Sequence, residues 1–192
     1  MSILDMLQQR LGGDAVNQIS RQLGTDPSTA QTAIAAALPM LVGALARNAQ
    51  DPDKAGALAN ALGRHDGSVL NDVGGYLGRG DISDGSGILG HVLGGRQETV
   101  QTGLGQATGL DPAKAGTLLA MLAPLVMGAL GKAQREKGLD TGGLAGMLGG
   151  EQQRAADAAP GIMGMLGSLL DRDRDGSVLD DIGGMIGKQF GR

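Results

Sequence analysis

The sequence contains no cysteine and no tryptophan, and it has only one phenylalanine and one tyrosine among its 192 residues. Without cysteine, the chain can form no disulfide, no thiolate metal site and no cysteine nucleophile. Aromatic side chains, which bury about 150–250 Å² each, are almost missing, so the core must be aliphatic. The absence of cysteine is compatible with a reducing cytosol.

Runs of basic residues are also missing, and the chain carries a net charge of −4 with a pI near 5.0. A nucleic-acid-binding protein is usually basic, because it must neutralise phosphates. The composition therefore predicts no nucleic-acid partner. Residues 1–11 lack a basic start and carry Asp5 within their apolar stretch, which favours an amphipathic helix over a signal peptide.

Glycine is abundant, with 36 residues, but it follows no collagen-like three-residue period. No segment alternates with the period of two that marks a strand, so the sequence predicts an all-α, multihelical fold. Some segments have glycine at every third position, as at Gly143, Gly146 and Gly149. Such glycines either form a face for tight helix packing or cap short helices, and we favour the caps.

Two apolar runs, residues 31–46 and 115–131, carry almost no charge and should form the central helices. A membrane-spanning helix needs about 20 apolar residues. Both runs are shorter than that, and each contains an internal proline, Pro39 or Pro124. Burial within the protein is therefore the favoured interpretation, and association with a membrane surface is kept as an alternative.

A tandem duplication relates the two halves. Gly-x-Asp-Pro occurs at residues 24–27 and again at 109–112, each time before one of the long apolar helices. The glycine suits a helix end, the aspartate an N-cap, and the proline the first position of the next helix.

The sequence thus predicts two homologous Ala/Gly-rich helical halves packed together. Their predicted bounds are residues 1–95 and 96–192. The second half has an insertion near residues 147–168 and ends in an acidic loop plus helix.

A second repeated motif, Asp-Gly-Ser-Val-Leu-Asx-Asp, lies at residues 66–72 and 175–181. Ser68 precedes an apolar segment and Asn71 follows three residues later, a spacing similar to a capping box. Because the first copy lacks the acidic residues that precede the second, the shared part cannot be explained by metal binding. We interpret it as a helix start.

The acidic residues of the second copy suggest calcium. Asp171, Asp173 and Asp175 match positions 1, 3 and 5 of an EF-hand loop, and Ser177 matches position 7, which offers its carbonyl. Asp181 is the candidate for the last ligand. Alternating carboxylates of this kind converge on one cation.

The match fails at position 12, where Ile182 replaces the bidentate glutamate and Asp181 falls one residue early. The alternative is a solvated turn whose aspartates cap the C-terminal helix. If the loop binds Ca²⁺, we expect a dissociation constant of about 10⁻⁴–10⁻³ M. Calorimetric titration of the wild type and of an Asp171→Ala/Asp173→Ala variant tests this, and no heat at millimolar Ca²⁺ would contradict it.

Signs of an enzyme are few. His65 and His91 are the only histidines, and they lie on different segments. The chain has no Walker phosphate loop and no Gly-x-Ser-x-Gly nucleophile elbow. We predict no catalytic residues and no resident cofactor other than the Ca²⁺ considered above.

Residues 15–39, with Leu23-Gly24-x-Asp26 and Leu38-Pro39, resemble the YidB-like bacterial domain of unknown function. The second half resembles it through residues 109–124. The resemblance implies a helical, cytoplasmic bacterial protein without an assigned activity, so it supplies no catalytic residues. We expect a non-enzymatic structural or protein-interaction module that binds itself or a protein partner through apolar, small-residue helix surfaces.

Overall fold

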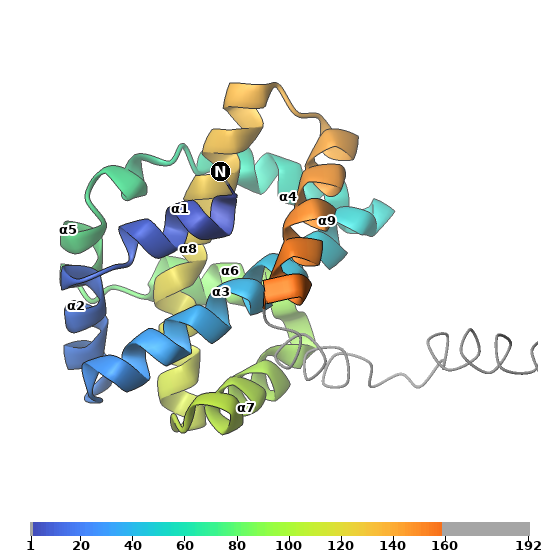
Figure 1. The fold of residues 1–192 in the computed structure, drawn as a ribbon. Coiled ribbons are helices and arrows are strands. Elements are labelled where there is room, and N and C mark those ends of the chain that lie inside the picture. Colours follow the sequence, from blue (N-terminus) through green and yellow to red (C-terminus); the bar gives the residue numbers. More distant parts are fainter. Residues whose placement is uncertain (1, 159–192) are drawn as a thin grey trace, which may run out of the picture.

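The computed structural model describes residues 2–158, and the regular secondary structure in that range is helical throughout (Figure 1). The all-α prediction is therefore confirmed. The α-helices are α1 (Ile3–Arg10), α2 (Asp14–Leu23), α3 (Pro27–Gln50), α4 (Pro52–Arg64), α5 (Val73–Gly78), α6 (Ser83–Leu93), α7 (Gln97–Thr108), α8 (Pro112–Lys137) and α9 (Thr141–Ala158). Two 3₁₀ turns, η1 (Ser68–Asn71) and η2 (Gly94–Arg96), join them.

The duplicated Gly-x-Asp-Pro sequence forms the same structure twice. Gly24 ends α2 at φ +58° and Gly109 ends α7 at φ +75°, in the left-handed region that glycine adopts readily. Asp26 and Asp111 are the N-caps of α3 and α8, and each carboxylate accepts a backbone N–H of the first turn, at 2.9 and 2.8 Å. Both predicted helix boundaries are confirmed.

Helices α3 and α8 cross at the centre of the molecule (Figure 1). They are long and apolar enough to cross a membrane, but 78 % and 83 % of their most apolar windows are buried inside the fold. Pro39 and Pro124 lie within continuous, buried helix. Such burial is typical of core helices, as the sequence predicted.

The two halves interlock around this central pair. Helices α4 and α6, from the first half, pack against α8 of the second. In the other direction, α7 and α9 pack against α3. The buried side chains of the described residues form one hydrophobic cluster drawn from both halves. Each half therefore completes part of the core of the other.

Glycine permits the closest contact between α6 and α8. A Cβ at Gly85 would overlap the backbone carbonyl of Ala120. On the outer side of α6, Gly87 is exposed and has open space around its Cβ position. Gly85 is thus a packing glycine, whereas Gly87 is not.

Some segment predictions need correction. The helix predicted to start at Ser68 is instead two elements, η1 and α5, because Asp72 begins a new helix. Gly143, Gly146 and Gly149 do not cap short helices but lie inside α9, so that interpretation was wrong. The apolar positions of α9 pack on the first half and stabilise a helix that glycine alone would disfavour.

Candidate functional site

The first copy of the repeated Asp-Gly-Ser-Val-Leu motif forms a tight entry turn. The Asp66 carboxylate accepts the Ser68 backbone N–H at 2.9 Å, and Gly67 has φ +82°. Hydrogen bonds from Ser68 hold the pKa of Asp66 below its usual range. Asp72 then caps α5 by accepting the Gly75 N–H at 2.8 Å.

The motif does start a helix, but through different residues from those predicted. Ser68 supplies its backbone N–H to Asp66 and makes no side-chain cap. Asn71 is the last residue of η1, and the N-cap of α5 is Asp72. The capping box was therefore misplaced, because an aspartate four residues after Ser68 captures the next helix start more directly.

The same turn is also a packing element against α8. A Cβ at Gly67 would lie 3.0 Å from the Lys132 Cβ and 3.1 Å from the Gly128 carbonyl oxygen. Arg135 reaches from α8 to the carbonyl oxygen of His65, at 3.4 Å. The first copy therefore packs its loop against the core helix α8.

The predicted calcium ligands lie outside the described residues. Asp171, Asp173, Asp175, Ser177 and Asp181 all belong to the second copy, so calcium binding there stays a prediction. Among residues 2–158, no group of three or more His, Cys, Asp or Glu side chains gathers to hold a metal ion.

The two histidines and the tyrosine interact mainly with residues that are near them in the sequence. The His91 Nδ1 is 2.8 Å from the carbonyl oxygen of Gly87 in its own helix, and His65 is the C-cap of α4. Burial, with the charges of Asp84 and Asp81, raises the pKa of Tyr76 to about 12.

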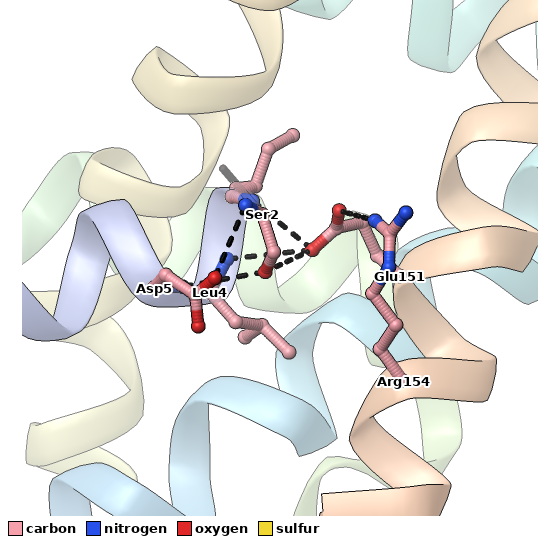
Figure 2. Close-up of polar contacts among 6 residues, drawn as sticks. Ser2, Leu4, Asp5, Glu151 and Arg154 are labelled. Atoms are coloured by element: carbon pink, nitrogen blue, oxygen red, sulfur yellow. Dashed lines mark hydrogen bonds and ion pairs between the residues drawn. The ribbon is translucent and has the colours of Figure 1, made fainter.

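The most unusual polar group is Glu151, which is only 3 % exposed although it carries a carboxylate. Figure 2 shows that this carboxylate lies between Ser2 at the start of α1 and Arg154 of its own helix. One of its oxygens, Oε2, accepts the Ser2 hydroxyl at 2.9 Å. The same oxygen accepts the backbone N–H groups of Ile3 and Leu4, at 3.1 and 3.4 Å. The other oxygen lies 2.7 Å from Nη1 of Arg154.

This carboxylate joins the two ends of the described chain. The first N–H groups of a helix have no partner within that helix, and its N-terminus favours negative charge. Glu151 of α9 satisfies two such groups of α1 and adds its charge there. It therefore fixes α9 to α1 across 148 residues of sequence.

A groove of about 440 Å³ adjoins this anchor. It lies between α9, the start of α1 and the end of α8. Its lining combines apolar, glycine and cationic residues: Ile3, Lys137, Leu139, Gly146, Met147, Gly150, Glu151 and Arg154. Nothing lies within 4 Å of a Cβ placed at Gly146 or Gly150, so another main chain can approach α9 closely here.

Sequence reasoning missed Glu151, although a signal was present. The buried positions of α9 are Leu144, Leu148, Glu151 and Ala155, which follow the spacing of one helix face. A glutamate on an otherwise apolar stripe indicates a paired, buried carboxylate.

Comparison with protein families finds a match. A family model described as "Bacterial protein of unknown function (DUF937)" matches residues 5–133 and 141–192. No curated protein and no solved structure matches the chain. The family-level resemblance inferred from the sequence is confirmed.

Proposed function

The chain belongs to the DUF937 family of bacterial proteins of unknown function, and on that premise we propose that it is a non-enzymatic protein-interaction module that binds a second copy of itself. The observation that carries this proposal is the groove beside Glu151. There, Gly146 and Gly150 leave open space on α9 next to the partly buried side chains of Leu139 and Met147.

The rest of the described surface supports the same interpretation. Between residues 2 and 158, no Leu, Ile, Val or Met side chain is fully exposed. A wide apolar patch is therefore not what this part of the protein offers a partner. The surface instead offers small residues, and a helix face of glycines lets a second helix approach closely.

Among residues 2–158, no three His, Cys, Asp or Glu side chains gather as a metal-dependent catalytic site would require, which favours a binding role. The buried carboxylate of Glu151 is fully engaged with α1 and Arg154, which leaves it no free position for acid–base work. Lys137 and Arg154 line the groove and would favour an acidic segment in the partner.

Filling the groove tests the proposal. We expect Gly146→Leu and Gly150→Leu to weaken self-association of the full chain by about tenfold or more, because a side chain then occupies the space a partner needs. Analytical ultracentrifugation over a wide concentration range measures this. Gly56→Leu on α4, which is also exposed and has open space around it, is the matched control.

Two outcomes would contradict the proposal. One is a wild type that remains strictly monomeric at every concentration. The other is an equal effect of the Gly56→Leu control, because the groove would then have no special role.

A further inference from the structure

Helix α9 is attached to one half of the protein but docks on the other. It follows α8 through a connection of three residues, 138–140, yet it packs on α3, α4 and α1. Its buried anchor, Glu151, bonds to Ser2 and to the first turn of α1. The open groove lies between α9 and the end of α8.

Alone, α9 would be a poor helix. It contains five glycines within 18 residues, at positions 142, 143, 146, 149 and 150. Each costs about 1 kcal/mol relative to alanine, and an isolated helix of this length is marginal even without them. The helix therefore depends on the surface of α3 and α1 that it covers.

That surface is the same on every copy of the chain. We propose that α9 exchanges between two copies, so that α9 of one copy docks on α1, α3 and α4 of the other. This rests on the proposed self-association and adds a contact between copies that is separate from the groove at Gly146 and Gly150. The docking contacts are identical within and between chains, so the two states differ mainly in the connection at residues 138–140.

The connection has a conformational requirement that can be altered. Gly138 has φ +60°, its N–H bonds to the Arg135 carbonyl oxygen at 3.3 Å, and the Leu139 N–H bonds to that of Gln134 at 2.9 Å. This left-handed turn ends α8 and folds the chain back. A β-branched side chain at Gly138 would disfavour the turn and favour a chain that runs on from α8 towards a second molecule.

The test compares two glycines with positive φ. We expect Gly138→Val to raise the dimer association constant of the full chain about tenfold or more, measured by light scattering at graded concentrations. Gly80→Val places the same strain in the loop between α5 and α6, at φ +65° with open space around it, and should leave that constant unchanged.

A mixed sample shows whether the helix itself has exchanged. One copy is ¹⁵N-labelled, and the other is unlabelled and carries a spin label at the exposed position Gln153→Cys. The label should broaden the α1 amide signals of the ¹⁵N-labelled copy in the same residue pattern as when both labels are on one chain, because an exchanged α9 makes identical contacts. A dimer without that broadening would overturn exchange while leaving self-association standing.

The remaining outcomes are also decisive. A Gly138→Val protein that stays as monomeric as the wild type, with α9 protected from hydrogen exchange, would overturn the exchange. If the wild type is monomeric at every concentration and only Gly138→Val forms a dimer that shows the broadening, exchange is a property of that variant, and both the exchange and the proposed function of the native chain fail.

Discussion

Replacing Gly85 by alanine should destabilise the protein by about 3 kcal/mol, because overpacking against a backbone atom cannot be relieved by turning a side chain. The new Cβ would overlap the Ala120 carbonyl, so α6 must move away from α8. Urea unfolding measures the change in the free energy of unfolding. Total stabilities are about 5–15 kcal/mol, so the loss is a large fraction.

Gly87→Ala is the matched control for Gly85→Ala. It makes the same substitution two residues later in α6, at an exposed site with open space. There, the higher helix propensity of alanine should stabilise the protein by up to about 1 kcal/mol. Equal effects of the two variants would show that α6 does not pack on α8 through Gly85.

Glu151→Ala should cost about 3 kcal/mol, because hydrogen bonds to a charged group are strong and their buried donors would lose their partner. The donors are the Ile3 and Leu4 N–H groups and the Ser2 hydroxyl. Urea unfolding gives the free energy. Hydrogen exchange should show that α1 loses protection before the rest of the protein.

Two further variants separate charge from packing at Glu151. Glu151→Gln keeps the shape and one acceptor oxygen, so its loss should be smaller than that of alanine. Gln153→Ala changes an exposed residue of the same helix and should have little effect. Unchanged protection of α1 in Glu151→Ala would contradict an anchoring role.

The sequence predicts well those features that depend on local chemistry. The Asp26 and Asp111 caps and the end of α2 at Gly24 follow from short-range hydrogen bonding and backbone freedom. The long apolar runs of α3 and α8 also identify the core helices, because a helix that is apolar around most of its circumference must be buried.

Features that depend on tertiary contacts were harder to predict. The glycines of α9 suggested turns, but the docking surface on the first half overrides their low helix propensity. Likewise, the partners that Glu151 binds at the start of α1 lie about 150 residues away, and nothing in the local sequence identifies them. Asp66 and Asp72 replace the predicted Ser68 cap because several side chains in this segment compete for the same few backbone N–H groups.

The crosswise packing also explains why a duplicated chain need not behave as two domains. Helices α4 and α6 complete the surroundings of α8, and α7 and α9 complete those of α3. Neither half, residues 1–95 or the described part of 96–192, encloses its own central helix with its own helices alone. Cutting between them would leave apolar faces of α3 and α8 open to water.

Differential scanning calorimetry of the full chain tests this interlocked core most directly. If the two halves share one core, unfolding is a single transition whose calorimetric and van't Hoff enthalpies are equal. Two separable transitions, or a calorimetric enthalpy well above the van't Hoff value, would show that the halves fold independently and would contradict the account.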